Sequence, residues 1–321
     1  MKHSRIATLA GIRYPIIQAS MVWLNSAELA AAVSNAGGLG VLGPNAGQRT
    51  ITHDGEEAAE RMREEIRKTR ALTDKPFAVN ALLPIAGLEL STKYAAPLFR
   101  VLIEENVRLV ITSGDRTEEG DRQIRRFKDE GFTVIHRDLS PTVESALHAE
   151  SLGVDALIVT GHEAGGHLSE HRISTLALVP QVVAAVDIPV IAAGGIIDRK
   201  GVKAALGMGA EGGYMGTRFI AVTESPASLK TKQLLINTRS EDLIELKTPV
   251  GTMKAVPTDH DVAQGETDLV KIGQRYIGGI KRAMLDGDIA NGFTTVSEAA
   301  GGIHTIKTAK EVIDDIAGAF Y

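Results

Sequence analysis

Short apolar runs alternate along the chain with longer stretches in which apolar residues recur at helical spacing. The runs are rich in β-branched residues and are continuous, a pattern typical of parallel strands that are covered on both faces. Strands that alternate with helices are joined by right-handed crossovers, and eight such units close a barrel. The eight runs are Tyr14 to Ala19, Gly38 to Gly43, Pro76 to Leu82, Val107 to Thr112, Phe132 to His136, Val154 to Thr160, Ile188 to Ala193 and Gly212 to Gly216.

Amphipathic segments separate these runs and have the length of barrel helices. The pattern therefore predicts the α/β class and a TIM (β/α)8 barrel, with a doubly wound open sheet as the alternative topology. The seven segments are Ser26 to Asn35, Glu56 to Leu72, Ala95 to Glu105, Glu118 to Glu130, Pro141 to Leu152, Thr175 to Val186 and Arg199 to Met208.

The last third of the chain has a different pattern of polar and apolar residues. Residues 223 to 268 are polar, contain three prolines and show little periodicity, whereas Leu269 to Leu285 and Thr308 to Phe320 have helical periodicity. We expect residues 1–222 to form the barrel core. Residues 223–321 are expected to form a C-terminal extension or lid subdomain whose helices pack back on the barrel.

Composition places the chain among globular proteins and excludes several functions. Of the 321 residues, 44% are hydrophobic and 23% are charged, which is enough apolar surface for a core. The net charge of −5 argues against binding nucleic acid through its phosphates. The absence of cysteine excludes disulfides, thiolate metal sites, iron–sulfur clusters and a cysteine nucleophile.

No targeting or membrane segment is expected. Only seven uncharged residues, Ile6 to Ile12, separate Arg5 from Arg13, which is too short a run for a signal peptide. No apolar run of 18 residues follows. We therefore expect a cytoplasmic protein that binds neither a membrane nor nucleic acid.

Glycine-rich turns follow the seventh and eighth predicted strands, where barrels of this kind often bind phosphate. They are Ala192 to Ile196, with Gly194 and Gly195, and Tyr214 to Thr217. Glycines let backbone N–H groups approach phosphate oxygens, a following helix adds its positive N-terminal end, and the hydroxyl of Thr217 can donate. A phosphate site is predicted here, the alternative being two tight turns without a ligand.

A histidine-rich segment follows the sixth predicted strand. Zinc-protease helices place histidines four apart around a glutamate, but Gly166 stands where the second histidine would follow His162 and Glu163. No metal site is expected, although His167 and His171 leave a helical metal pair open. His162 and His171 are expected to be solvated loop residues. A histidine on a glycine-rich loop at the barrel mouth, such as His167, is suited to proton transfer near neutral pH.

Residues Asn35 to Gly40 superficially resemble a dinucleotide-binding fingerprint. The glycines of that fingerprint follow a strand and open a helix, whereas these follow a predicted helix and open a strand. We interpret the segment as a helix C-cap and a close backbone turn. Nicotinamide binding through a Rossmann domain is therefore not predicted.

Asn80 lies at the C-terminal end of the third predicted strand. A buried amide is costly unless it forms hydrogen bonds, and a heteroaromatic ring with donors and acceptors is a suitable partner. The alternative is that Asn80 caps a turn.

Taken in order, six segments resemble the family of flavin mononucleotide (FMN) enzymes that contains nitronate monooxygenase and the flavin-dependent enoyl-acyl carrier protein reductase II. Glu163 to His167 is highly specific in this context, and weaker similarity continues from Ala283 to Gly302. The six segments are Tyr14 to Met21, Leu29 to Gly40, Lys75 to Asn80, Glu163 to His167, Pro189 to Ile196 and Met215 to Phe219.

The resemblance implies a barrel that binds FMN noncovalently, with His167 as the active-site histidine. It places Ala19, Ser20, Met21 and Asn80 at the isoalloxazine ring. It assigns the phosphate to Gly194, Gly195, Gly216 and Thr217. Further cofactor contacts that it implies are Glu163, Gly165, Gly166 and Met215.

The chain departs from the family pattern at two places. Ala19-Ser20 follows Gln18 where a small residue with proline, or a glycine pair, is usual, which alters hydrogen bonding near the flavin. Ser297-Glu298-Ala299 stands where many members have Gly-Gln, which puts a charge near the pocket rim.

The resemblance predicts an FMN-dependent oxidoreductase acting on a small molecule, first of all a nitronate monooxygenase that uses dioxygen. The alternative is NAD(P)H-dependent reduction of an enoyl thioester, toward which Val22-Trp23 and Leu72 to Pro76 lean, whereas Ala31 to Asn35 is common in monooxygenases. A third hypothesis is a flavin-free phosphate-binding barrel, either isomerase or sensor. A homodimer is left open.

Overall fold

The computed structural model describes residues 4–85, 89–248, 251–257 and 279–321. Each of the eight predicted runs contains a strand of one parallel sheet, and the bounds differ by only a few residues. The strands are β1 (Ile16–Gln18), β2 (Gly40–Leu42), β3 (Phe77–Leu82), β4 (Leu109–Ser113), β5 (Thr133–Arg137), β6 (Ala156–Thr160), β8 (Val190–Ala193) and β9 (Gly212–Met215).

The strands form a ring in the order β1-β9-β8-β6-β5-β4-β3-β2. The ring closes beside β2, where Leu39 N–H donates to Ile16 O at 2.8 Å and Gln18 N–H donates to Leu39 O at 3.0 Å. The predicted TIM barrel is thus confirmed, and the open sheet is wrong. An interior apolar cluster contains Ile17, Ile111 and Ile191, so the barrel is a packed core and not a pore.

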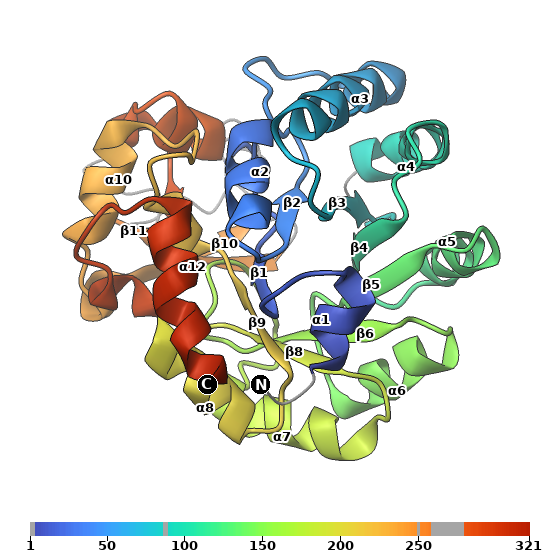
Figure 1. The fold of residues 1–321 in the computed structure, drawn as a ribbon. Coiled ribbons are helices and arrows are strands. Elements are labelled where there is room, and N and C mark those ends of the chain that lie inside the picture. The colour runs from blue at the N-terminus through green and yellow to red at the C-terminus, as the bar shows by residue number, and fades with distance from the viewer. Residues whose placement is uncertain (1–3, 86–88, 249–250, 258–278) are drawn as a thin grey trace.

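Helices surround the ring, as Figure 1 shows. Most begin at a residue whose side chain accepts a hydrogen bond from the first turn, for example Ser26 from Leu29 N–H and Thr142 from Ser145 N–H. Helix α4 begins six residues earlier than predicted. The helices between the strands are α2 (Ala27–Asn35), α3 (Gly55–Leu72), α4 (Glu89–Glu104), α5 (Glu118–Asp129), α6 (Val143–Ser151), α7 (Thr175–Ala185) and α8 (Arg199–Gly207).

A short helix that the sequence did not predict, α1 (Arg5–Ala10), covers the N-terminal end of the barrel (Figure 1). Its Ile6 is fully buried and belongs to the same cluster as the interior strand residues. Because this end is covered by apolar side chains, a ligand has access to the ring only from the C-terminal ends of the strands.

The predicted helix near the end of the chain is confirmed as α12 (Ala309–Ala317), followed by η5 (Gly318–Phe320). It contacts α2 and α8, and its Ile313 and Ile316 are buried in the main core of the barrel. Helix α12 therefore completes the ring of helices, although β9 is followed directly only by the four-residue α9 (Thr217–Ile220). The division of the chain at residue 222 stays a prediction.

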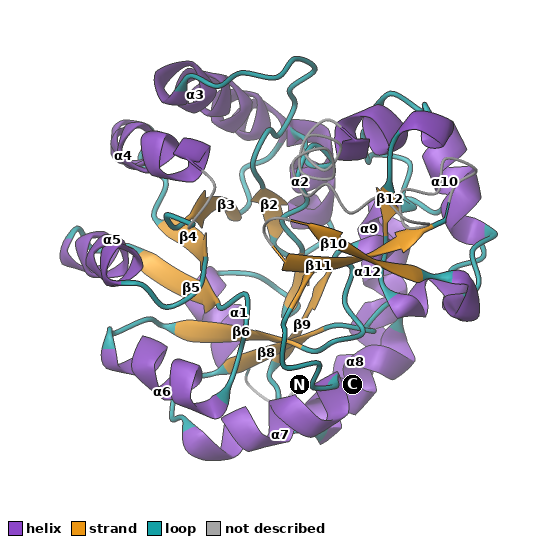
Figure 2. Ribbon diagram, turned by 180° about the vertical axis from the view of Figure 1, so that it is seen from behind, coloured by secondary structure: helices purple, strands orange, loops and turns teal. Residues whose placement is uncertain are grey.

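The extension contains an antiparallel sheet that was not predicted. Its strands are β10 (Ile244–Thr248), β11 (Gly251–Val256) and β12 (Thr294–Thr295), and β7 (Gly166–Leu168) from the loop after β6 joins it. Figure 2 shows β10 and β11 lying across the C-terminal end of the barrel. A second apolar cluster fills the space beside them.

The rest of the extension is made of short helices. Most of the predicted helix Leu269 to Leu285 lies outside the described residues, and its end is a π-helix, η2 (Lys281–Leu285). The other helices are α10 (Leu229–Ile236), η1 (Ser240–Asp242), η3 (Ile289–Asn291) and η4 (Glu298–Gly302). No helix among the described residues is long and apolar enough to span a membrane.

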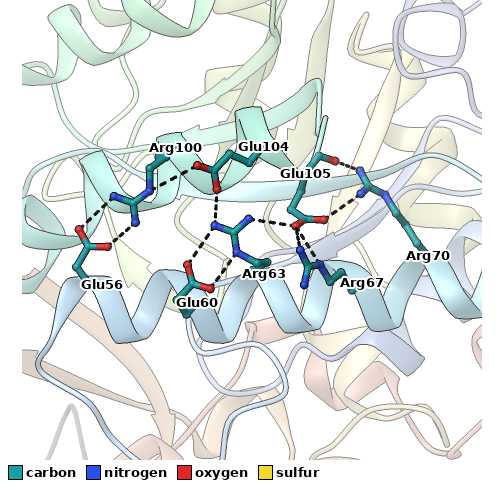
Figure 3. Close-up of polar contacts among 8 residues, drawn as sticks. All are labelled: Glu56, Glu60, Arg63, Arg67, Arg70, Arg100, Glu104 and Glu105. Atoms are coloured by element: carbon teal, nitrogen blue, oxygen red, sulfur yellow. Dashed lines mark hydrogen bonds and ion pairs between the residues drawn. The ribbon is translucent and has the colours of Figure 1, made fainter.

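An ion-pair network joins α3 to α4 on the outside of the barrel (Figure 3). The Glu105 side chain is only 8% exposed, and its carboxylate lies 3.1 Å from Arg63, 2.8 Å from Arg67 and 3.4 Å from Arg70. Burial acts to raise the pKa of Glu105, but hydrogen bonds from Arg67 and Arg63 outweigh it and hold the pKa below its ordinary value. Glu105 is therefore ionised in the folded protein.

We predict that Glu105→Gln lowers the free energy of unfolding by about 2 kcal/mol, because it leaves Arg63 without its least exposed acid partner. Glu104→Gln, at a side chain 47% exposed, is the matched control and should cost less than about 1 kcal/mol. Urea unfolding at neutral pH measures both. Since the pKa of Glu105 is lower in the folded state, its contribution is complete above about pH 5 and is lost as the pH falls through the folded-state pKa. Equal losses for the two variants would contradict the assignment.

Candidate active site

A cavity of about 520 Å³ lies between the C-terminal ends of the barrel strands and the extension. We call the strand-end side chains the floor: Ala19, Asn80, Ser113, Arg137, Thr160, Ala193 and Tyr214. We call the side chains from β7 and the extension the roof: His167, Met253, Ile280, Met284, Thr295 and Ser297.

The structure brings twelve of the thirteen predicted site residues to this one cavity. They come from five separate segments at the ends of β1, β3, β6, β8 and β9, which the parallel barrel gathers at one end. The role of each toward a ligand stays a prediction. The twelve are Ala19, Ser20, Met21, Asn80, Gly165, Gly166, His167, Gly194, Gly195, Met215, Gly216 and Thr217.

Glu163 is the predicted residue that does not line the cavity. Its carboxylate accepts hydrogen bonds from the backbone N–H (2.9 Å) and the hydroxyl (2.8 Å) of Thr175, at the start of α7. Its backbone oxygen accepts from the Ser297 hydroxyl at 2.6 Å and from Glu298 N–H at 3.0 Å. Glu163 therefore fixes the loop after β6 to α7 and to the extension, and its predicted contact with a cofactor stays a prediction.

His167 lies on a strand and not, as predicted, on a loop. It is opposite Met253 in the β7–β11 pairing. Gly251 lies against its ring: a Cβ there would be 2.4 Å from Cε1 of His167. The extension thus fixes both the backbone and the ring of His167 in the roof. Because His167 is not helical, the helical metal pair with His171 is excluded.

The two other histidines of this segment differ from one another. His171 is exposed, as expected. His162 is not a solvated loop residue: its side chain is 16% exposed, and Nε2 lies 3.0 Å from Oε1 of Glu245 on β10. Glu245 also pairs with Arg172 at 2.8 Å. Among the described residues, no group of three or more His, Asp or Glu side chains is placed to hold a metal ion.

The predicted charge at Glu298 has a partner. Lys254 on β11 has a side chain only 5% exposed, and its Nζ lies 2.7 Å from Oε1 of Glu298. The same ammonium donates to the backbone oxygen of His162. One buried cation thus neutralises the rim carboxylate and ties the extension to the start of the His167 segment.

Of the two glycine turns, the one after β8 has the left-handed backbone that lets N–H groups turn toward a ligand, and the helix ends contribute less than predicted. Gly194 and Gly195 have φ of +97° and +70°, the left-handed region that favours glycine. The N-terminus of α8 is capped by the carboxylate of Asp198, which accepts from Gly201 N–H at 2.8 Å. The N-terminus of α8 is thus already occupied by an anion, and α9 has only four residues. The loop N–H groups and the Thr217 hydroxyl remain as donors to a phosphate.

Asn80 is only 1% exposed, and the nitrogen and oxygen of its side-chain amide differ in their hydrogen bonds. Nδ2 donates to the Ile111 backbone oxygen at 2.9 Å and to the Ser113 hydroxyl at 2.8 Å. Oδ1 is buried at the cavity and has no hydrogen-bond partner among the described residues. Because buried acceptors are rarely left unsatisfied, this atom indicates a ligand donor rather than a turn cap.

Four polar floor residues were not among the predicted site residues: Ser113, Arg137, Thr160 and Tyr214. The Tyr214 hydroxyl accepts from Ser20 N–H at 2.7 Å, and burial raises the pKa of Tyr214. Arg137 is the last residue of β5, one position beyond the predicted run. A charged side chain directly after an apolar strand run was the signal for Arg137, since barrel sites gather at strand ends. Tyr214 gave no such signal, because it lies inside a predicted strand.

A sequence model described as nitronate monooxygenase matches residues 3–318 of the chain. The chain belongs to the nitronate monooxygenase family. Members of this family are flavin-dependent oxidoreductases, which overturns the flavin-free barrel and confirms the resemblance seen in the sequence.

The curated proteins that are similar to this chain have two kinds of name. A probable nitronate monooxygenase of Staphylococcus saprophyticus is 35% identical over 276 residues, covering 75% of this chain and 74% of the relative. A hydroxy-methyl-oxo-octahydroindene-carboxyl-CoA dehydrogenase of Rhodococcus jostii is 38% identical over 234 residues, covering 71% of this chain. The match spans only 59% of that relative's length.

Solved structures of the same fold cover the whole chain. FabK from Thermotoga maritima is 33% identical with a TM-score of 0.86, and the match covers 100% of this chain and 96% of FabK. A nitroalkane oxidase from Streptomyces ansochromogenes is 24% identical with a TM-score of 0.76, covering 98% of this chain and 99% of its own. At that identity the second likeness shows the fold alone.

Proposed function

We propose that the protein is an FMN-dependent nitronate monooxygenase, which oxidises alkyl nitronates with dioxygen. One observation supports this most: an unsatisfied acceptor in the floor, Oδ1 of Asn80, and a fixed imidazole in the roof, His167, face the same cavity. The first is suited to a cofactor ring and the second to a substrate bound above that ring.

The residues present fit FMN. The pyrimidine part of a flavin has an N–H flanked by carbonyls, so it offers the donor that Asn80 Oδ1 lacks. Three lining residues have a methyl side chain or none, which leaves room for a flat ring in the cavity. They are Ala19, Ala193 and Gly216. The hydroxyl oxygen of Thr217 accepts from Ser297 N–H at 2.9 Å, so its proton is oriented away and free to donate to a phosphate. When bound, the flavin supplies the two-electron acceptor.

His167 would bind and orient the substrate from the roof, and polarise or deprotonate it. Its β7 strand is held by β11, so the imidazole keeps its position over the cavity. The apolar side chains of Met253, Met284 and Ile280 line the same roof and limit the access of water. A less hydrated cavity strengthens the interaction between the imidazole and the negative charge of a nitronate.

Reduction of an enoyl thioester by NAD(P)H is the second candidate, and the cavity mouth favours it. Val22 and Ile51 line the cavity and are 40% and 43% exposed, so the rim offers apolar contacts that suit an acyl chain. FabK, an enoyl reductase, and the carboxyl-CoA dehydrogenases are similar to this chain. Since the chain lacks a dinucleotide fingerprint, NAD(P)H would have to enter by the same mouth and alternate with the substrate.

Anaerobic reduction separates the two functions. We predict that an alkyl nitronate bleaches the flavin absorbance rapidly, whereas NADH and NADPH do so slowly or not at all, because a monooxygenase is reduced by its own organic substrate. Stopped-flow absorbance in the absence of oxygen is the measurement. Rapid bleaching by NADH together with no response to the nitronate would make the enoyl reductase the better assignment.

We predict that Gly195→Asp weakens FMN binding by about tenfold or more. Two like charges about 4 Å apart repel by roughly 1 to 4 kcal/mol near a protein surface, which is enough for that change. Gly131→Asp is the matched control: its φ of +75° is close to the +70° of Gly195, it lies between α5 and β5, and a Cβ there meets no atom within 4 Å. Titration of the apoprotein with FMN measures both. Loss of binding in both variants would mean that backbone strain, not phosphate repulsion, is responsible.

We predict that His167→Ala keeps FMN but lowers turnover of a nitronate by about 100-fold or more, the usual effect of removing a positioned acid or base. The β7–β11 pairing uses the backbone and should persist. The exposed His171→Ala is the control and should retain full activity. Steady-state oxygen consumption measures the rate, and flavin absorbance measures retention. Turnover of His167→Ala at the wild-type rate would show that the roof histidine has no chemical role.

A further inference from the structure

The cavity has a side wall that belongs to neither the floor nor the roof. This wall is built by β3 and by the segments that follow β2, β3, β4 and β5, on the side of the barrel where α3 and α4 lie (Figure 1). Most of its side chains are apolar, so it suits the hydrocarbon part of a substrate. We call these six side chains the side wall: Ile51, Leu82, Ile85, Tyr94, Asp115 and Leu139.

The backbone just before Asp115 fixes the place of this residue in the side wall. Leu83 N–H donates to Ser113 O at 2.8 Å, and Gly114 N–H donates to Arg137 O at 3.2 Å. These bonds continue the pairing of β3, β4 and β5 beyond the strand ends. A Cβ at Gly114 would lie 2.7 Å from Cβ of Leu83, so glycine permits this close approach. Asp115 is therefore held by the barrel itself.

The carboxyl group of Asp115 has an acceptor that no protein donor satisfies. Its Oδ1 is buried and has no hydrogen-bond partner among the described residues. The neighbouring acid is Asp138, whose Oδ1 accepts from Ser140 N–H at 2.8 Å. Burial, the charge of Asp138 and the contact with its carboxyl group raise the pKa of Asp115. Asp115 thus holds a proton more readily than an ordinary carboxyl group, and it can either donate or accept.

We propose that Asp115 recognises a hydroxyl group at the end of the substrate that is remote from the reacting carbon. This inference rests on the proposed function, because it names the class of nitronate: an unbranched chain with a terminal hydroxyl group. The apolar side wall covers the chain, and Asp115 binds its end. A hydroxyl group suits either protonation state, since it donates to a carboxylate and accepts from a carboxylic acid.

An ammonium group fits the side wall less well than a hydroxyl group. It would lose its hydration among apolar side chains, and Arg137 at the adjacent strand end would repel it. A proton on Asp115 would also remove the charge that an ammonium group needs. A different alternative is that Asp115 and Asp138 share one proton and satisfy one another without a ligand.

Carboxylates test the side wall without turnover. A carboxylate has the planar shape and negative charge of a nitronate but is not oxidised as a nitronate is. The first pair of probes is 4-hydroxybutanoate and pentanoate, which differ only by a terminal hydroxyl group in place of a methyl group. Hydroxy acids one methylene shorter and longer, each with its methyl counterpart, extend the comparison to three chain lengths. Isothermal titration calorimetry of the FMN-loaded protein measures each affinity.

We expect wild type to bind the hydroxy acid of the best chain length about tenfold more tightly than its methyl counterpart. Asp115→Leu has a similar shape and no acceptor, so it should abolish this preference. Asp115→Asn, which keeps an acceptor and a donor, should retain part of it. Asp74→Leu is the control, since Asp74 is 84% exposed and precedes β3 at the other end of the barrel.

The outcomes separate this inference from the proposed function. If the protein oxidises no nitronate, the proposed function fails, and the carboxylate pairs still decide whether Asp115 recognises a hydroxyl group. Equal affinities within all three pairs would mean that the two carboxyl groups satisfy one another, and would overturn the inference. Tighter binding of 4-aminobutanoate than of 4-hydroxybutanoate, or a preference that persists in Asp115→Leu, would overturn it as well.

A contact of Asp115 with the cofactor would give a different result. In that case Asp115→Leu would lose FMN, which flavin absorbance measures, and the assignment to the substrate would be wrong. If circular dichroism shows that Asp115→Leu does not fold, Asp115→Ala replaces it in every comparison.

Discussion

Closure of the parallel ring is the constraint on which the site depends. The β1–β9 pairing makes the first and last strands of the barrel neighbours, and the bonds of Leu39 with Ile16 and Gln18 close the ring between β1 and β2. Because all eight strands are parallel, their C-terminal ends meet at one mouth, and residues far apart in the chain become neighbours there. The buried Ile6 of α1 covers the other end. The same geometry that fills the barrel with apolar side chains leaves only one end for polar chemistry.

The extension turns this open mouth into a cavity because one of its strands pairs with a strand from a barrel loop. β7 comes from a barrel loop and β11 from the inserted segment, so their hydrogen bonds join the two parts at His167. Lys254 and Ser297 add contacts to the backbone of the same loop at His162 and Glu163. Since each contact also places the roof over the floor, the position of His167 depends on the fold of the extension and not only on the barrel.

The sequence predicted the barrel well because its signal is local: each strand is a continuous apolar run and each helix has its own period. The roof sheet has no such signal, since β7 and β11 pair across more than eighty residues, as in Gly166 with Lys254. The direction of the Glu163 side chain could not be predicted for a related reason, because a motif identifies a residue as part of a site but not which way its side chain points. The helix end expected to bind phosphate is already capped by Asp198, a residue type that favours the N-cap position.

The charges around the cavity bear on which substrate suits it. Arg137 contributes an unpaired positive charge, and the negative charge of Glu298 is compensated by Lys254. Asp115, a carboxyl group that lines the cavity, has its pKa raised by burial and by the neighbouring charge of Asp138, which reduces the negative charge that it holds at a given pH. The cavity therefore favours anions. An alkyl nitronate enters as an anion, so this distribution of charge is suited to binding a nitronate.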